Sequence, residues 1–304
     1  MESSLFAKVE KESMSDNEKL KQDIIQKFGT PCAVIDLDIV DRNIAHLQAL
    51  CDKAKLANRP HIKTHKSPLL ALRQLEAGAT GITCQKLGEA EVMFRAGITD
   101  ILIATNIIGA AKSGKLAALL RDVSLQVCAD NPISLDAYAE AGRAAGRPVT
   151  VVIECDTGQK RAGVVTPNEA VALAKIVQRD PWLEFGGLMF YPPLDGWPVT
   201  QEFFDTTQAG LSSLSLAPKI ISTGGTPNLK HLGLLDGATE HRSGTSIFLM
   251  STTAVKPRSV KTSMRMAMAR GSSKTESSEL MYAKPEMECF STMGMKFDWI
   301  KSTT

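Results

Sequence analysis

Eight short apolar runs, separated by longer amphipathic or polar segments, recur between residues 32 and 223 of the chain. Most of them are rich in valine and isoleucine, as expected for strands that are buried on both faces of a sheet. This alternation predicts parallel strands connected by helices. We expect the strands at 32–37, 60–63, 81–84, 100–105, 124–129, 149–155, 185–190 and 219–223.

The number of these units favours a closed barrel over an open sheet. Eight units in about 225 residues match the usual length of a (β/α)8 barrel. A doubly wound open sheet would give a similar alternation, but no GxGxxG sequence follows the first expected strand. We therefore predict an α/β fold of the (β/α)8 TIM-barrel type, with helices that begin near Asp38, Pro68 and Thr166.

The chain divides by composition into three parts. A polar lead-in covers residues 1–28, the expected barrel covers 29–248, and the alternation is lost in the segment 249–304. That last segment holds eight of the twelve methionines and few apolar strand faces, which a β-domain needs to offset the entropy of ordering it. We predict an incomplete C-terminal β-domain remnant that is poorly ordered or loosely docked.

Composition excludes several classes of protein. The chain is 43% apolar and 22% charged with a net charge of +2, which gives no sign of a nucleic-acid or membrane partner. Residues 1–22 lack the apolar core of a signal peptide, and no apolar run reaches the ~18 residues of a membrane span. The six cysteines contain no CxxC spacing, so we expect a reducing, cytoplasmic location.

Polar residues follow several of the expected strands. In a (β/α)8 barrel the reactive groups gather at the carboxyl ends of the strands, and phosphate is held after the seventh and eighth. The candidate site residues at these positions are Lys63, Gln85, Arg161, Tyr191, Gly224, Gly225 and Thr226.

Lys63 is the candidate nucleophile. A nucleophilic lysine must be a neutral amine, which desolvation or nearby cations favour. Lys63 ends an expected strand within a basic cluster made of Arg59, His61, His65 and Lys66. The alternative is a solvated basic loop, and Lys66 is the rival nucleophile, although we expect it to point away from the barrel axis.

The glycine-rich turn at Gly224, Gly225 and Thr226 offers backbone N–H groups and a hydroxyl that suit a phosphate. Glycines also make ordinary turns, so the turn alone indicates little. Arg161 follows an expected strand and suits an anion, a phenolate oxygen or a ring nitrogen, or else it is a surface arginine. Tyr191 stands before two prolines that would fix its ring, or else it is a packed loop residue.

Taken together, these motifs resemble one family. Residues 29–97, which include RPHIKTHK and TCQKLGEAE, are closely similar to the D-threonine aldolase and D-serine dehydratase family. The likeness continues in DTGQKRAGV (156–164), GGLMFYPP (186–193), STGGTP (222–227) and TEHRSGTSIF (239–248). The family has the alanine-racemase-type barrel and uses pyridoxal 5'-phosphate (PLP) as its cofactor.

The resemblance assigns expected roles to the candidate residues. It implies that Lys63 carries PLP as a Schiff base, that Arg161 contacts the cofactor ring and that Tyr191 lies beside the pyridine. The other residues that it places against the cofactor are Gln85 on the rim and Gly225 and Thr226 in the phosphate-binding loop.

The sequence also departs from the family pattern. Members end in a β-domain with a His-x-Cys or His-x-Asp site for a divalent metal, and none of the five histidines here has that spacing. Ser246 replaces the tyrosine of a Gly-Thr-Tyr motif, and Pro192 replaces a histidine that follows the tyrosine in many aldolases. We therefore expect a PLP site without the family's metal ligands.

The resemblance implies a PLP-dependent lyase that acts on a small D-amino acid with a β-hydroxyl, by dehydration or by aldol cleavage. It also implies a homodimer. Two alternatives stay open: a PLP-binding protein without turnover, which would be a cofactor carrier or an inactive truncated relative, and a barrel aldolase that uses Lys63 without PLP.

Overall fold

The computed structural model describes residues 16–30, 34–249, 280–283 and 299–301. The chain forms two compact units, Met1–Asn43 with Ser251–Thr304, and Ile44–Met250. The predicted boundaries at residues 28 and 248 stay predictions. Most of the C-terminal segment, and with it the expectation of poor order, lies outside the described residues.

The first unit contains a small antiparallel sheet. Its described elements are α1 (Asp16–Phe28), β1 (Val34–Asp36), β10 (Leu280–Ala283) and β11 (Trp299–Lys301), and the strand order is β1-β10-β11. The prediction that residues 32–37 form the first barrel strand is therefore wrong. Its three strand residues are only half-buried and pair with β10, whereas a barrel strand is buried on both faces.

The second unit alternates strands and helices. Its strands are β2 (Ala57–Asn58), β3 (Ile82–Cys84), β4 (Asp100–Ile103), β5 (Ser124–Ala129), β6 (Val149–Cys155), β7 (Leu183–Phe190), β8 (Ile220–Gly224) and β9 (Glu240–Arg242). Its helices are α3 (Pro68–Glu76), α4 (Leu87–Arg95), α5 (Ala110–Leu120), α6 (Pro132–Ala145), α7 (Pro167–Arg179), α8 (Trp197–Ser213), α9 (Ser246–Leu249), and the 3-10 helices η1 (Ile62–Thr64) and η2 (Thr226–His231). Helix α2 (Leu37–Lys53) begins in the first unit and ends in the second.

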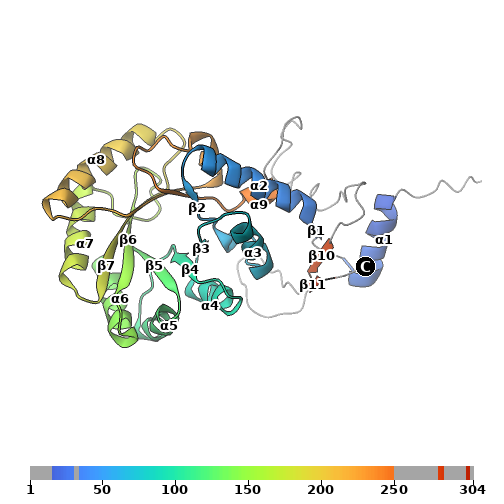
Figure 1. Ribbon diagram of the computed structural model, residues 1–304, viewed down its shortest axis with the longest axis horizontal. Helices are drawn as coiled ribbons and strands as arrows, with labels where there is room; N and C mark the ends of the chain where they lie inside the picture. Colours follow the sequence, from blue (N-terminus) through green and yellow to red (C-terminus); the bar gives the residue numbers. More distant parts are fainter. Residues whose placement is uncertain (1–15, 31–33, 250–279, 284–298, 302–304) are drawn as a thin grey trace, which may run out of the picture. The chain divides into compact units, whose positions relative to one another are not determined.

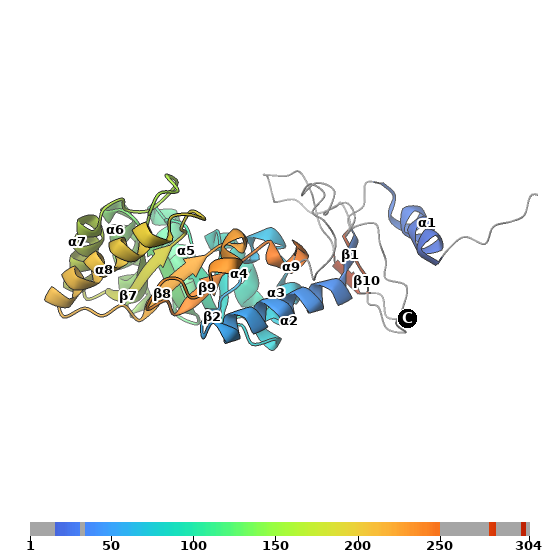
Figure 2. The same ribbon diagram turned by 90° about the horizontal axis from the view of Figure 1, so that it is seen from above.

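The eight strands of the second unit are parallel and follow the order β2-β9-β8-β7-β6-β5-β4-β3. The two ends of this sheet meet. Arg59 donates its backbone N–H to the His241 carbonyl on one side (2.9 Å), and the Thr83 N–H donates to the Pro60 carbonyl on the other (2.8 Å). Helices α3 to α8 lie outside the strands (Figure 1), and β7, β8, β9 and β2 follow one another in the turned view (Figure 2). The predicted TIM-type barrel is confirmed.

Two barrel strands differ from the predicted ones. The strand expected at 60–63 lies at 57–58, because the chain beyond Pro60 makes one bridge and then turns into η1. The eighth barrel strand is β9, so the run at 219–223 supplies the seventh. Strand β9 has the sequence Glu-His-Arg, which contains no apolar run. Its three side chains are buried, and Glu240 and Arg242 form hydrogen bonds inside the barrel.

The helix starts follow capping rules. Ser67 caps α3 ahead of Pro68, and Thr166 accepts a hydrogen bond from the Glu169 N–H (3.2 Å) in a capping box at the start of α7. The cap of α2 is Asp36, whose carboxylate accepts from the Ile39 N–H (3.1 Å), so the predicted cap at Asp38 is two residues late.

An ion-pair network lies inside the barrel. Arg59 is 5% exposed; its Nε donates to Glu240 Oε2 (2.7 Å) and its Nη1 to Asp100 Oδ1 (2.5 Å). Ser222 donates to the second Glu240 oxygen (2.5 Å). A Cβ atom at Gly81 would lie 2.5 Å from Arg59 Nη1, so a glycine at this position leaves room for the arginine. The network connects the segment directly after β2 with strands β4, β8 and β9.

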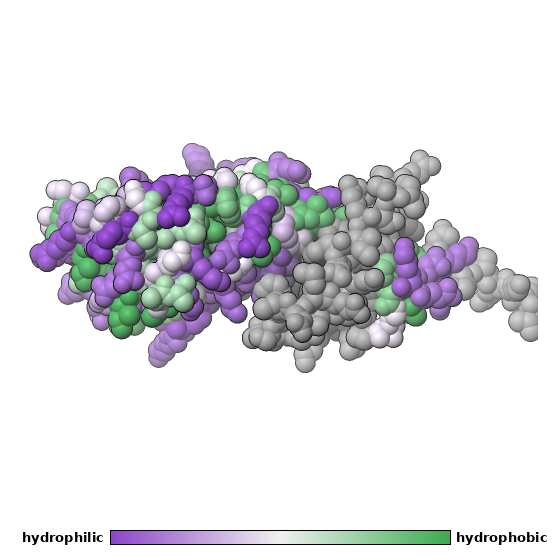
Figure 3. Space-filling model, turned by 90° about the horizontal axis from the view of Figure 1, so that it is seen from below, coloured by the Kyte–Doolittle hydropathy of each residue, from purple (hydrophilic) through white to green (hydrophobic). Residues whose placement is uncertain are grey.

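The described surface is mixed in character. Hydrophilic residues cover much of the face of the second unit in Figure 3, with smaller apolar areas between them. Within the described ranges, no helix combines the length and the apolar character that a membrane span requires.

Candidate functional site

A cavity of about 430 Å³ lies at the carboxyl ends of the barrel strands. It brings together six residues that the sequence singles out, and these are Lys63, Gln85, Arg161, Tyr191, Gly225 and Thr226. Gly224 is the last residue of β8 and is not among the lining residues; a Cβ there would lie 3.0 Å from Arg242 Nη2. The loops that follow different strands therefore meet at one site, as the barrel topology dictates.

Lys63 lies in η1 and its side chain extends into the cavity. Its Nζ lies 3.4 Å from Gln85 Oε1. Burial lowers the pKa of the Lys63 amine, and the positive charges of Arg161 and Arg242 lower it further. A lysine in such surroundings is a neutral amine more readily than a lysine in water, which is the form that attacks a carbonyl.

The basic cluster predicted around Lys63 does not supply this positive field. Arg59 is paired with two carboxylates inside the barrel. Burial lowers the pKa of His65 to about 4, so its ring is neutral at physiological pH. Lys66 lies outside the cavity lining and forms an ion pair with Glu89 (3.3 Å). The cations that face Lys63 come instead from loops and strands far away in the sequence.

His61 is a lining residue whose role the sequence does not reveal. It is 8% exposed, and burial, Lys63 and Arg242 hold its pKa well below the usual value. Its Nδ1 accepts a long hydrogen bond from the Lys63 backbone N–H (3.4 Å), so a neutral ring carries its proton on Nε2. That Nε2 is buried and makes no hydrogen bond of normal geometry with a described residue, although the neighbouring Gln85 side chain acts on the pKa of the ring.

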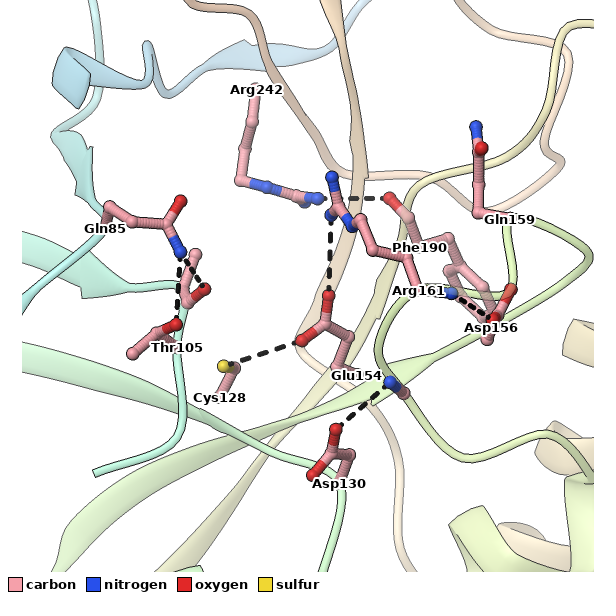
Figure 4. Close-up of polar contacts among 12 residues, drawn as sticks. Gln85, Thr105, Cys128, Asp130, Glu154, Asp156, Gln159, Arg161, Phe190 and Arg242 are labelled. Carbon is pink, nitrogen blue, oxygen red and sulfur yellow. Dashed lines mark hydrogen bonds and ion pairs between the residues drawn. The ribbon is translucent and has the colours of Figure 1, made fainter. Parts of the chain in front are cut away.

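Arg161 is held between an aromatic ring and a carboxylate. Its guanidinium carbon lies 4.6 Å from the centroid of the Tyr191 ring, and its Nη2 lies 3.9 Å from Glu154 Oε1 (Figure 4). Its backbone N–H donates to Asp156 Oδ2 (3.0 Å), which fixes the loop. Glu154 is not among the residues that the sequence singled out, although a single carboxylate in the apolar strand VTVVIEC is a signal of function. Burial raises the pKa of Glu154.

Arg242 is the second arginine that lines the cavity, and it is also not among the residues that the sequence singled out. It is buried at the end of β9, where its Nη2 donates to the Phe190 carbonyl (3.1 Å) and its Nη1 to the Ser222 hydroxyl. Burial lowers its pKa, and Glu240 and Glu154 counteract this. Only the family-like stretch TEHRSGTSIF could have indicated it, because β9 has no apolar pattern.

The glycine-rich turn forms one wall of the cavity. Gly225 has a φ of 109°, and a Cβ there would lie 2.3 Å from Cε2 of Tyr191. Its N–H donates to the Arg242 carbonyl (2.8 Å), so that N–H is not free for a ligand. Gly244, in the loop after β9, also lines the cavity, and a Cβ there would lie 3.0 Å from the His61 carbonyl. The absence of a Cβ at the two glycines lets the Tyr191 ring and the His61 carbonyl pack closely against this wall.

The described residues include no group of three or more histidine, cysteine, aspartate or glutamate side chains arranged to hold a metal ion. The expectation that the family's metal ligands are missing concerns mainly the C-terminal segment, which lies largely outside the described part of the chain.

The fold and the site define a (β/α)8-barrel protein with a lysine and two arginines around one cavity at the strand ends. Residues 35–252 match the family described as "Alanine racemase, N-terminal domain". The chain belongs to this family.

Its relatives include enzymes of D-hydroxy amino acids. The chain is 40% identical to a D-threonine aldolase from Arthrobacter sp. over 169 residues, which cover 56% of this chain and 45% of that protein. It is 35% identical to the D-threo-3-hydroxyaspartate dehydratase of Delftia sp. (strain HT23) over 239 residues, covering 75% and 63%. The crystal structure of D-threonine aldolase from Filomicrobium marinum matches 72% of this chain and 62% of its own, with a TM-score of 0.69 and 31% identity. The chain thus spans roughly half to two thirds of the length of these relatives.

Proposed function

We propose that this chain is a PLP-dependent lyase that acts on a small D-amino acid with a β-hydroxyl, and that Lys63 holds the cofactor as a Schiff base. The observation that carries the proposal is the Lys63 amine, which lies in the cavity with a lowered pKa and faces Arg161 and Arg242. The relatives' names, aldolase and dehydratase, support a lyase of this substrate class.

The lining residues fit the chemistry of PLP. Gly225 and Gly244 line the cavity after β8 and β9, the seventh and eighth barrel strands, which is where barrels of this type hold a phosphate. Thr226 contributes a hydroxyl, which also contacts Ser243 (2.8 Å) and accepts from the Ser246 N–H (3.2 Å), and Arg161 and Arg242 would offset the negative charge of a phosphate. When bound, PLP supplies an electron sink for the bonds that break in the substrate.

The chain's own residues hold and orient the reacting groups. The lowered pKa of Lys63 favours the unprotonated amine that attacks a carbonyl carbon, and Gln85 Oε1 lies 3.4 Å from that nitrogen as an acceptor. Arg161, stacked on Tyr191, directs its N–H donors into the cavity, where they suit a ring oxygen or a carboxylate. His61 is a cavity residue whose lowered pKa favours the uncharged ring, so it adds no positive charge beside Lys63.

Borohydride reduction of the purified protein with PLP tests this proposal. We expect peptide mapping to find a pyridoxyl group on Lys63. In a separate assay of the unreduced protein, we expect D-threonine, D-serine or D-threo-3-hydroxyaspartate to release either glycine and an aldehyde or ammonia. A label on Lys63 without any product would indicate a PLP-binding protein without turnover. A protein that takes up no PLP but cleaves an aldol would indicate a lysine aldolase.

We also propose a cytoplasmic homodimer. The four described cysteines, Cys51, Cys84, Cys128 and Cys155, are free and buried, which suits a reducing compartment. Light scattering of the purified chain measures the oligomeric state.

Replacing Gly225 with valine should weaken PLP binding by about tenfold or more, because strain of this kind costs on the order of 1–3 kcal/mol. A β-branched residue does not tolerate a φ of 109°, and its Cβ would displace the Tyr191 ring. Arg161→Lys keeps the charge and should have a smaller effect. Fluorescence titration with PLP measures both affinities, and equal affinity of Gly225→Val and wild type would contradict the assignment of the turn.

A further inference from the structure

The side-chain amide of Gln85 has a fixed direction. Its Nε2 donates to the Ala104 carbonyl (3.2 Å) and to Thr105 Oγ1 (3.1 Å), the second of which can be followed in Figure 4. Its backbone N–H donates to Glu89 Oε2 (2.7 Å), which anchors the residue at the end of β3. A glutamine amide has two N–H donors, and both are used here, so its oxygen must face the other way.

The oxygen of that amide faces the cavity lysine. Gln85 Oε1 lies 3.4 Å from Lys63 Nζ. A reversed amide would place its oxygen against the Ala104 carbonyl, and two acceptors facing each other repel, so the Ala104 contact favours the observed orientation. The hydrogen-bond network therefore places the amide oxygen, which is an uncharged acceptor, next to the Lys63 nitrogen.

The cations that face Lys63 disfavour its ammonium form. Arg161 reaches it from the loop after β6 and Arg242 from the end of β9. His61 lies two residues before it and is neutral. Burial and these two arginines together lower the pKa of the lysine amine.

Each carboxylate near Lys63 has a cation of its own. Glu89, on α4, forms an ion pair with Lys66 (3.3 Å), and Glu154, on β6, faces Arg161 (3.9 Å). These charges raise the pKa of Lys63 less than burial and the arginines lower it. The contact with Lys63 Nζ that has hydrogen-bond geometry goes to the uncharged Gln85.

We propose that Gln85 is a positioning residue that fixes the direction of the Lys63 nitrogen without fixing its charge. A carboxylate in the same place would hold the nitrogen equally well but would bind it as an ammonium ion, which cannot attack a carbonyl. An apolar side chain would leave the charge unchanged and lose the direction. The inference rests on the proposed role of Lys63 as the nucleophile.

Gln85→Glu tests this with a near-isosteric change. The full chain is first treated with hydroxylamine, which frees Lys63 of any bound carbonyl compound. It is then labelled competitively with acetic anhydride across a pH series, and mass spectrometry quantifies the acetylation of Lys63. A carboxylate within about 4 Å should raise the midpoint of Lys63 labelling by about one pH unit or more, which lowers its reactivity at neutral pH about tenfold. Gln208→Glu, the same charge change at an exposed site on α8, should leave the midpoint unchanged.

Gln85→Met is the second variant, and it should not raise the pH midpoint of Lys63 labelling. It removes the acceptor without adding charge, so the Lys63 midpoint should stay at the wild-type value or fall below it. An unchanged midpoint in Gln85→Glu, or a raised one in Gln85→Met, would overturn the proposal, and the methionine variant decides alone if the glutamate variant does not fold. The labelling needs no PLP, so a failure here is distinct from a failure to find PLP on Lys63.

Discussion

Replacement of Lys63 with alanine should abolish the visible absorbance of the Schiff base and leave no pyridoxyl label after borohydride. The Lys63 side chain is exposed to the cavity and packs in no core, so its removal should leave the barrel folded. The glycine-lined end of the cavity, at Gly225 and Gly244, remains, so we expect PLP to bind weakly and reversibly. Absorbance spectra, peptide mapping and thermal unfolding measure the three effects.

Lys66→Ala is the matched control for this experiment. Lys66 lies three residues further along the chain, pairs with Glu89 and does not line the cavity. Its removal should leave the label on Lys63 intact. A label that survives in Lys63→Ala, or one that disappears in Lys66→Ala, would assign the nucleophile to the other lysine.

The strand ends that carry the site were predictable where the strands are long and apolar. Strands β6 and β7 have buried patterns over most of their lengths, so the sequence alone places Arg161 and Tyr191 after their ends, and both residues line the cavity. Strand β9 was not predictable in this way, because its three residues are polar. The hydrogen-bond partners that make Arg242 a buried cavity residue come from β7 and β8, and no local pattern encodes them.

The electrostatics of the site were the least predictable part. Neighbours in sequence suggested that His65 and Lys66 would activate Lys63, yet one is neutral and the other is paired. The lowered pKa of Lys63 comes instead from burial and from Arg161 and Arg242, which lie about 100 and 180 residues away in the chain. Only the folded barrel brings these charges together.

The ion-pair network inside the barrel should matter more for stability than any surface pair. Arg59→Ala should lower the free energy of unfolding by about 3–5 kcal/mol, because it leaves a buried carboxylate without its partner. Glu240 is the carboxylate most affected, since its side chain is 5% exposed and 2.7 Å from Arg59 Nε. Asp100, at 38% exposure, can turn to water.

The position of Arg59 explains why the effect should extend to the whole barrel. Arg59 lies in the segment that hydrogen-bonds to β9 on one side and leads to the contact with β3 on the other, which is where the sheet closes. Burial would lower the pKa of its guanidinium, but Glu240 and Asp100 hold it above the ordinary value. The charge is therefore present at every pH at which the protein folds.

Lys219→Ala is the control, because Lys219 forms a similarly close pair with Glu184 (2.9 Å, against 2.7 Å for Arg59 and Glu240) in which the two side chains are 75% and 47% exposed. Exposed pairs of this kind contribute about 0–1 kcal/mol. Urea unfolding of the two variants compares a buried with an exposed pair in one barrel. A loss below about 1 kcal/mol for Arg59→Ala would mean that water reaches Glu240 and that closure of the barrel does not depend on this network.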